Sequence, residues 1–150
     1  MSDIVSPEQR SKNMSAIHSK NTKPEVYFRK LLFNQGYRYH IAEKTVSGHP
    51  DLFLRKYNTA IFVHGCFWHR HKDCRFAYTP KSRTEFWLPK FERNMQRDMV
   101  VQADLRKAGI KCLIIWECTI KAMQRDSDIM NSVLNACIHF LHSEDLFLEI

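Results

Sequence analysis

The spacing of apolar residues along this chain alternates between a helical period and a period of two, which predicts a mixture of helices and strands. One helix is predicted to begin at residues 22–25. Thr22 and Glu25 stand three positions apart there, as in a capping box, and a proline lies in the first turn. The apolar face of this helix begins at Val26, and Gly36 lies just where a helix of this length ends.

Three further segments have a helical pattern. The first begins with a capping sequence at residues 6–9 and is predicted to end near residue 18. The second is long and spans residues 84–107, with Gly109 just beyond its end. The third is an amphipathic helix predicted over residues 126–141.

Strand patterns occupy the region between these helices. Residues 37–41 alternate between apolar and polar, and residues 111–116 form a short apolar run typical of a buried strand. Residues 51–56 and 59–64 are predicted to pair as a hairpin through a two-residue turn, which would place Asp51 opposite His64. The order of these elements predicts a single α/β domain, in which helices flank a mixed sheet.

The composition narrows the possible classes of protein. The chain has 150 residues, enough for one domain with a single core. It contains no apolar run of the roughly 20 residues that a membrane span needs. Because its polar first residues do not resemble a signal peptide, the expected location is the cytosol.

Charge is distributed unevenly along the chain. Lys and Arg number 23 and Asp and Glu 16, a net charge of +7. Residues 126–150 contain five acidic residues and no Lys or Arg, so the first 125 residues carry +12 against −5 in the tail. A basic body favours a polyanionic partner, most plausibly nucleic acid, over a solvated surface without one.

The five cysteines indicate metal binding rather than disulfides, because their number is odd and no secretion signal precedes them. Cys112 and Cys137 lie in apolar runs and are predicted to be core thiols. The others accompany a histidine-rich segment, and thiolate and imidazole are the ligands that zinc prefers. The candidate zinc ligands are Cys66, Cys74, either His69 or His71, and Cys118.

The predicted hairpin suggests a second site. A carboxylate from Asp51 and an imidazole from His64 on one sheet face could bind a hard cation and move a proton beside it. Phosphodiester cleavage needs both functions. Glu25 is a possible third member. Taken singly, a surface aspartate, a half-buried histidine and a helix-capping glutamate would be the ordinary interpretations.

Several short blocks resemble the very short patch repair endonucleases, which are bacterial enzymes that nick DNA at thymine–guanine mismatches. The resemblance covers roughly residues 8 to 120 and keeps the blocks in the same order. They are residues 10–14 (RSKNM), 48–51 (GHPD), 64–69 (HGCFWH), 83–87 (RTEFW) and 116–118 (WEC).

The resemblance implies a restriction-endonuclease-like core and magnesium-dependent nicking of one strand, 5′ to the thymine of a T:G mismatch left by deaminated 5-methylcytosine. It implies that Asp51 binds Mg²⁺ together with the backbone carbonyl of Val63, where the family often has threonine. It also implies that His64, oriented by Glu25, activates water, and that His69 contacts the scissile phosphate and assists the leaving group. The zinc ligands that it implies are Cys66, His71, Cys74 and Cys118.

The same resemblance implies how the mismatch is recognised. Phe67 and Trp68 would intercalate beside it, and Met14 would enter from a DNA-contacting arm or helix formed by residues 1–20. Lys90 and Asn94, four apart on the long helix, would meet the mismatched bases. Three arginines are candidates for phosphate contacts: Arg83, Arg93 and Arg97.

The expected protein is therefore a monomeric mismatch nickase of the bacterial cytoplasm, associated with the nucleoid, with catalytic Mg²⁺ and structural Zn²⁺. Its expected partners are duplex DNA with a T:G mismatch and, from the family, repair-pathway proteins. One alternative is a restriction or homing-type nuclease that cuts both strands. Another is a non-catalytic, zinc-stabilised DNA-binding module, for which Asp51 and His64 would be dispensable.

Overall fold

Five strands form one mixed sheet at the centre of the protein, in the order β1-β2-β3-β4-β5. The computed structural model describes residues 21–150; the helix predicted before residue 18 lies outside them, as does Met14. β1, β2 and β3 are antiparallel, whereas β4 runs parallel to β3 and to β5. The strands are β1 (His40–Ile41), β2 (Leu52–Leu54), β3 (Thr59–His64), β4 (Lys111–Trp116) and β5 (Phe147–Glu149).

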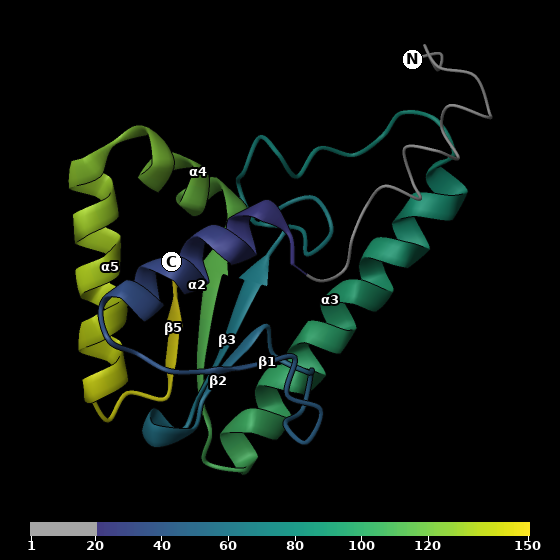
Figure 1. Ribbon diagram of the computed structural model, residues 1–150. Coiled ribbons are helices and arrows are strands. Elements are labelled where there is room, and N and C mark those ends of the chain that lie inside the picture. The colour runs from purple at the N-terminus through teal and green to yellow at the C-terminus, as the bar shows by residue number, and fades with distance from the viewer. Residues whose placement is uncertain (1–20) are drawn as a thin grey trace.

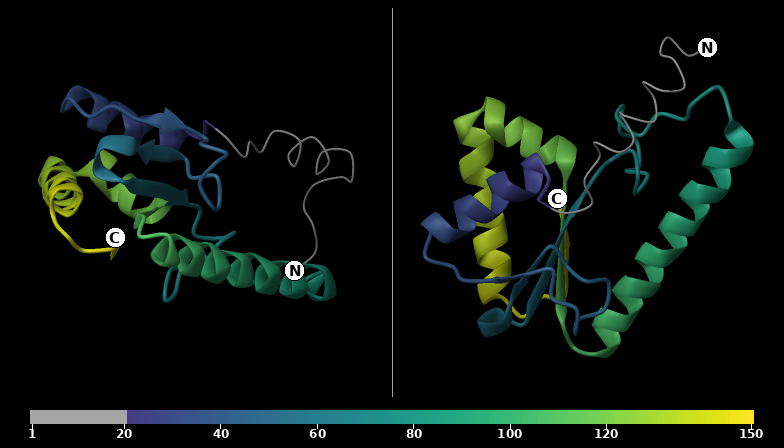
Figure 2. Two further views of the ribbon diagram at one scale, coloured as in Figure 1. Left: turned by 90° about the horizontal axis from the view of Figure 1, so that it is seen from below. Right: turned by 45° about the vertical axis from the view of Figure 1, so that its right-hand side comes forward.

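Helices cover both faces of this sheet, which confirms the predicted α/β class (Figure 1; Figure 2). One face packs against α2, α4 and α5 through a core that includes Phe28, Leu113 and Phe140. The other packs against the carboxyl half of α3, where Leu105 meets Phe62. The helices are α2 (Lys23–Asn34), α3 (Thr84–Lys107), α4 (Glu117–Arg125) and α5 (Ser127–His142).

Local signals account for the ends of the predicted helices. Thr22 and Glu25 form the expected capping box on α2, and Gly36 follows that helix at φ +93°. α3 has the predicted bounds and contains Pro89 without interruption. Asp126 caps α5, its carboxylate accepting hydrogen bonds from the backbone N–H groups of Asp128 and Ile129.

The register predicted for the hairpin is wrong by two residues. A 3₁₀ turn (Arg55–Tyr57) and Asn58, at φ +50°, connect the strands, so Leu54 rather than residue 56 pairs with Thr59. Asp51 therefore lies near residue 62 instead of opposite His64. Because side chains alternate between sheet faces, a shift of two keeps Asp51 on the same face as His64.

The strand predicted over residues 37–41 contains only His40–Ile41, and two elements were not predicted. α4 begins directly after β4, and the side chain of Trp116 at its N-cap does not cap the helix, so no capping signal marks its start. β5 lies in the acidic tail and pairs with the edge of β4. Lys111 anchors this tail, since its buried ammonium donates hydrogen bonds to the carbonyls of Phe140, Leu141 and Ser143.

Candidate active site

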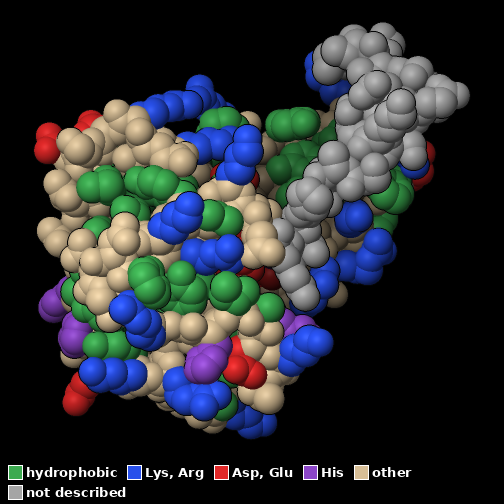
Figure 3. All heavy atoms as spheres, viewed as in Figure 1, with side chains coloured by type: hydrophobic (Ala, Val, Ile, Leu, Met, Phe, Trp, Pro, Cys, Tyr) green, Lys and Arg blue, Asp and Glu red, His purple; other side chains and the backbone are tan. Residues whose placement is uncertain are grey.

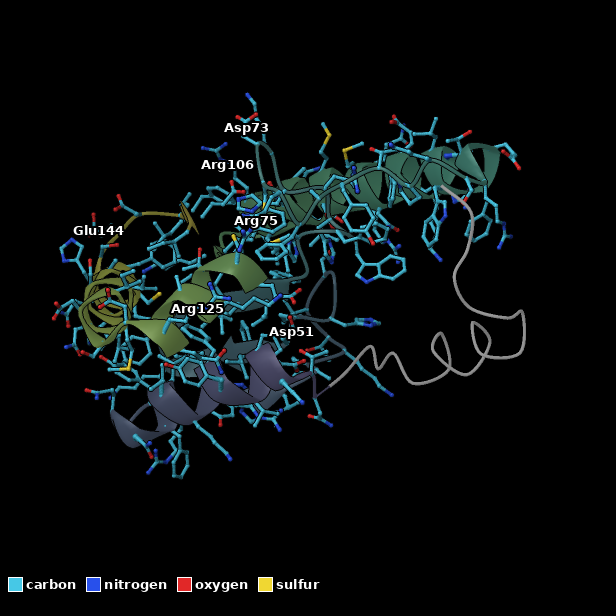
Figure 4. The ribbon with its side chains drawn as sticks, turned by 90° about the horizontal axis from the view of Figure 1, so that it is seen from above. Asp51, Asp73, Arg75, Arg106, Arg125 and Glu144 are labelled. Carbon is cyan, nitrogen blue, oxygen red and sulfur yellow. The ribbon has the colours of Figure 1, made fainter. Side chains whose placement is uncertain are left out.

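A pocket of about 690 Å³ opens at the carboxyl end of β3, between the sheet and α3. Asp51 lies between α2 and α3 in Figure 4. Glu25 and Phe67 are not part of the pocket wall. The wall includes eight of the residues predicted to act in catalysis or DNA binding: Asp51, Val63, His64, Trp68, His69, Lys90, Asn94 and Arg97.

Asp51 reaches this pocket because of the turn that precedes β2. Gly48 in that turn has φ +82°, and a Cβ on it would lie 2.5 Å from a methyl group of Val101 and 3.1 Å from the ring of Phe62. Only glycine lets the turn approach α3 and β3 so closely. Asp51 then accepts a hydrogen bond from the backbone N–H of Val63 at 2.7 Å, which fixes its carboxylate at the end of β3.

The environment of Asp51 disfavours an isolated negative charge. Burial raises the pKa of this carboxyl to about 7; the nearby Glu25 raises it further, and the hydrogen bond from Val63 opposes the shift. A cation beside the carboxylate would restore its charged form. Oxygen ligands suit magnesium, and the Asp51 carboxylate and the Val63 carbonyl are the donors that could hold it.

His64 and His69 form a stacked pair of imidazoles in the same pocket. Their ring centroids are 3.8 Å apart and their planes differ by 4°. Burial lowers the pKa of His64 to about 3, with a smaller contribution from His69. Among the described residues, the buried Nδ1 of His64 has no hydrogen-bond partner. His64 is therefore neutral near pH 7 and retains a nitrogen that can accept a proton.

Asp98 of α3 completes this cluster. Its carboxylate lies 2.7 Å from Nδ1 of His69, and one ligand atom from each of Asp98, His69 and His64 falls within 4.8 Å of the other two. A metal ion lies close to the plane of an imidazole that binds it, so two parallel stacked rings are poorly arranged to share one. We therefore interpret the cluster as proton-handling groups, in which Asp98 orients His69 and leaves its Nε2 free.

Glu25 lies at the start of α2 and is 3% exposed. Its carboxylate accepts a hydrogen bond from the backbone N–H of Thr22, and burial raises the pKa of Glu25. The structure gives no hydrogen bond between Glu25 and His64. Within residues 21–150, Glu25 acts on the pocket through its charge, which reaches Asp51.

The predicted zinc ligands converge beside this pocket. One ligand atom from each of the four residues lies within 4.8 Å of the others, and His71, not His69, completes the set. His71 Nδ1 is 3.6 Å from the sulfur of Cys66 and 3.4 Å from that of Cys118. Three thiolates with one imidazole form a closed set of four ligands typical of structural zinc. The ligand set is Cys66, His71, Cys74 and Cys118.

The tail of the chain supports this zinc site. The ring of His71 stacks on Trp116, with centroids 4.1 Å apart and planes within 6°. The indole N–H of Trp116 in turn donates a hydrogen bond to Glu149 of β5 at 2.8 Å. A side chain that orients a metal-binding histidine helps to fix the geometry of that ligand. Glu149 of β5 therefore supports the zinc site through Trp116, which stacks on His71.

An aromatic cluster lies on the loop of residues 65–83, which joins β3 to α3. Phe67 is its centre, with four aromatic rings around it at centroid distances of 5.0 to 5.4 Å: Trp68, Tyr78, Trp87 and Phe91. Trp87 is half-buried in this cluster, whereas Trp116 is buried in the core. Two residues of α3 contact Trp68: Lys90 lies 5.4 Å from its ring, and Asn94 donates to its carbonyl at 3.0 Å.

Comparison with known proteins decides the family. Residues 2–75 match the family described as DNA mismatch endonuclease Vsr. The chain is 48% identical over 121 residues to the type II nicking enzyme V.NmeAIP of Neisseria meningitidis, covering 81% of this chain and 86% of that protein. It is 38% identical over 128 residues to the DNA mismatch endonuclease Vsr of Escherichia coli, covering 85% and 81%. The chain belongs to the Vsr family.

A Vsr-family protein is a strand-nicking endonuclease, so its substrate is DNA. The surface agrees with that substrate, since Lys and Arg predominate over Asp and Glu on the face seen in Figure 3. No helix in residues 21–150 is long and apolar enough to cross a membrane.

One residue of the Vsr-family pocket was missed from the sequence. Asp98 lies four residues after Asn94 and thus one helical turn further along the same face of α3. A helical projection of residues 84–107 would have shown a carboxylate next to Lys90 and Asn94. Acidic residues are common on solvated helices, however, and only the contact with His69 distinguishes this one.

Proposed function

We propose that this Vsr-family protein nicks one DNA strand 5′ to the thymine of a T:G mismatch, by magnesium-dependent hydrolysis that initiates very short patch repair. A single observation carries the proposal. One pocket combines a buried carboxylate, Asp51, with the stacked pair of His64 and His69, and Trp68 of the aromatic loop forms part of its wall. Hydrolytic groups and a base-stacking surface thus meet in one place.

His64 is suited to accept a proton from the attacking water. Its low pKa keeps the ring neutral, and its buried Nδ1, which has no hydrogen-bond partner within residues 21–150, can serve as an acceptor. In this assignment Glu25 tunes the site by its charge and helps to orient His64. As water adds to phosphorus, the proton leaves the water oxygen and the bond to the leaving oxygen breaks.

His69 is suited to assist the departure of the leaving group. With Nδ1 directed to Asp98, the Nε2 of His69 is free to contact the scissile phosphate and to donate a proton to the leaving oxygen. The carboxylate of Asp98 orients the His69 ring, just as a carboxylate orients the histidine of a catalytic triad.

Magnesium fits the donor set of Asp51 and the Val63 carbonyl. When bound, it would supply charge neutralisation at the phosphate and acidify a water molecule. The buried Asp51 carboxylate, held by the N–H of Val63, provides the negative oxygen for such a cation. Since Val63 would contribute its backbone carbonyl, the lack of a threonine hydroxyl leaves this role intact.

Mismatch recognition is assigned to the 65–83 loop and α3. Phe67 and Trp68 would enter the base stack, and Lys90 and Asn94 would meet the displaced base edges. Met14 would act from the N-terminal arm. The enzyme would work as a monomer in the bacterial cytoplasm, at the nucleoid, with repair-pathway proteins downstream.

The decisive test is nicking of a panel of labelled duplexes in magnesium buffer. We expect a single cut, 5′ to the mismatched thymine, with a rate on T:G at least about a hundredfold above that on matched T:A. Cuts in both strands of matched DNA would support the restriction-type alternative. Binding without any magnesium-dependent cut would support the non-catalytic module instead.

Asp98→Asn should lower kcat on the T:G duplex by about a hundredfold, because the amide can keep the contact with His69 but lacks the negative charge that the carboxylate places beside that ring as the leaving group departs. The Kd for the mismatched duplex should change by less than about threefold. Glu92→Gln, an exposed substitution on the same helix, is the matched control and should retain the wild-type rate. An unchanged kcat in Asp98→Asn would remove Asp98 from the mechanism.

A further inference from the structure

We propose that Arg70 is the positioning residue that holds the 65–83 loop in its DNA-inserting shape and so determines how strongly the enzyme prefers mismatched over matched DNA. This inference rests on the proposed function, and it concerns a residue that is neither part of the pocket wall nor one of the zinc ligands. Four hydrogen bonds, two cation–π contacts and an unusual backbone conformation support it.

The guanidinium of Arg70 joins the two ends of the loop. One of its nitrogens donates to the carbonyl of Phe67 at 3.2 Å and to that of Tyr78 at 3.0 Å. The other donates to the carbonyl of Ala77 at 2.8 Å and to the hydroxyl of Thr79 at 3.0 Å. A planar fork with five donors can serve four acceptors at once, which an ammonium group cannot do with the same geometry.

Arg70 also ties the loop to α3. Its guanidinium lies 3.9 Å from the ring centroid of Phe91, which is 3% exposed and anchors the helix beneath the aromatic cluster. The ring centroid of Phe67 lies 5.6 Å from the same guanidinium. Arg70 thus links the backbone of Phe67, the segment 77–79 and α3 through one side chain.

The backbone at Arg70 agrees with this role. Its φ of +54° is unfavourable for a residue with a Cβ, and such strain persists only where surrounding contacts determine the conformation. Within the loop the last zinc ligand is Cys74, so the metal would hold residues 66–74, whereas the hydrogen bonds of Arg70 reach residue 79. The position of Phe67 therefore depends on both the zinc site and Arg70.

The test compares Arg70→Lys, which keeps the charge and loses the fork, with Arg75→Lys as the matched control. Arg75 lies on the same loop, and its exposed guanidinium stacks on Phe76. For Arg70→Lys we expect KM on the T:G duplex to rise about tenfold, the value of one stacked base, while kcat at saturation changes less than about threefold. Arg75→Lys should match the wild type in both.

A spectroscopic readout separates positioning from folding. A 2-aminopurine beside the mismatch should brighten when wild-type protein inserts its aromatic residues in magnesium-free buffer, and Arg70→Lys should give less than about half of that signal. Zinc content should stay at one per chain. Thr79→Val removes a single acceptor and should shift KM in the same direction by about two- to threefold, with no further shift in the double variant.

The outcomes are distinguishable. If wild-type protein does not prefer the T:G duplex, the proposed function itself fails. If it does, and Arg70→Lys keeps the wild-type KM and fluorescence signal, only the role of Arg70 is overturned. Loss of zinc or of cooperative unfolding in Arg70→Lys would also overturn it, because Arg70 would then maintain the fold and not the presentation of Phe67.

Discussion

Asp51→Asn should lower the rate of T:G nicking at saturating DNA and magnesium by at least about a thousandfold, which corresponds to roughly 4 kcal/mol of transition-state stabilisation. The amide has nearly the same shape as the carboxylate and keeps an oxygen for the N–H of Val63, which lies 2.7 Å away. Only the negative charge is lost. Because that charge is what a divalent cation requires, catalysis should fail while the pocket keeps its form.

Binding provides the complementary measurement. Since the aromatic loop and α3 are untouched, the Kd of Asp51→Asn for the mismatched duplex should stay within about threefold of the wild-type value. Asp73→Asn is the matched control: Asp73 is exposed on the zinc-bearing loop with φ +57°, a conformation that asparagine tolerates, and it is remote from Asp51 in Figure 4. Nicking by Asp51→Asn at the wild-type rate would show that magnesium binds elsewhere.

Asp51→Asn should also change how the free energy of unfolding depends on pH. In the folded protein the pKa of Asp51 is about 7, well above its ordinary value, so the native state holds a proton that the unfolded chain has released. In magnesium-free buffer this difference destabilises the wild type progressively between about pH 4 and pH 7, by at most about 4 kcal/mol. His64 has the opposite effect, because its lowered pKa destabilises the fold at acidic pH.

Because both proteins contain His64, the difference in stability between Asp51→Asn and the wild type reports the contribution of Asp51 alone. Asp51→Asn should therefore unfold at a higher temperature than the wild type at pH 8, and the gain should shrink toward pH 4. Added magnesium should reduce the gain by stabilising only the wild type. An equal stability at all pH values would indicate that the Asp51 carboxylate is well solvated.

The fold was predictable where local chemistry decides an element. The capping box of Thr22 and Glu25, the apolar run of β4 and the glycine after α3 are signals carried by neighbouring residues. The hairpin register was predicted wrongly because the residues between the two strands do not distinguish a 3₁₀ turn from a two-residue turn. β5 was missed because three residues of an acidic tail form a strand only through pairing with β4 and the anchor at Lys111.

In the candidate site, too, residues marked by their neighbours in the sequence were predictable, whereas residues that act through long-range contacts were not. Residues in contiguous blocks, such as His64, Cys66 and His69, were identified because their close spacing is itself unusual. The zinc choice between His69 and His71 depended on the family resemblance, and the cluster of ligand atoms supports His71. Asp98 and Arg70 were not predicted, since each acts through a contact made in three dimensions by an ordinary charged residue.

Removing the zinc should abolish nicking even when magnesium is restored. The zinc ligands Cys66 and Cys74 hold the first half of the 65–83 loop, and Cys118 connects that loop to the start of α4. Burial disfavours the thiolate form of Cys66 and raises its pKa, so without the metal this ligand would be a neutral thiol and would no longer help to hold the loop. His69 and Trp68 would then lose their positions in the pocket, and we expect at least about a hundredfold loss of rate.

Cys118→Ala tests this connection without a chelator, and Cys137→Ala is the matched control. Cys137 is buried in the core on α5, so its substitution should cost about 1 kcal/mol of stability yet leave one zinc per chain and the wild-type nicking rate. Cys118→Ala should lose zinc, become sensitive to protease within residues 65–83, and keep most of its helical circular dichroism, because the sheet and its other helices have their own core. Full activity of zinc-free protein in magnesium would contradict a structural metal, and global unfolding of Cys118→Ala would show that the metal holds the whole domain and not the loop alone.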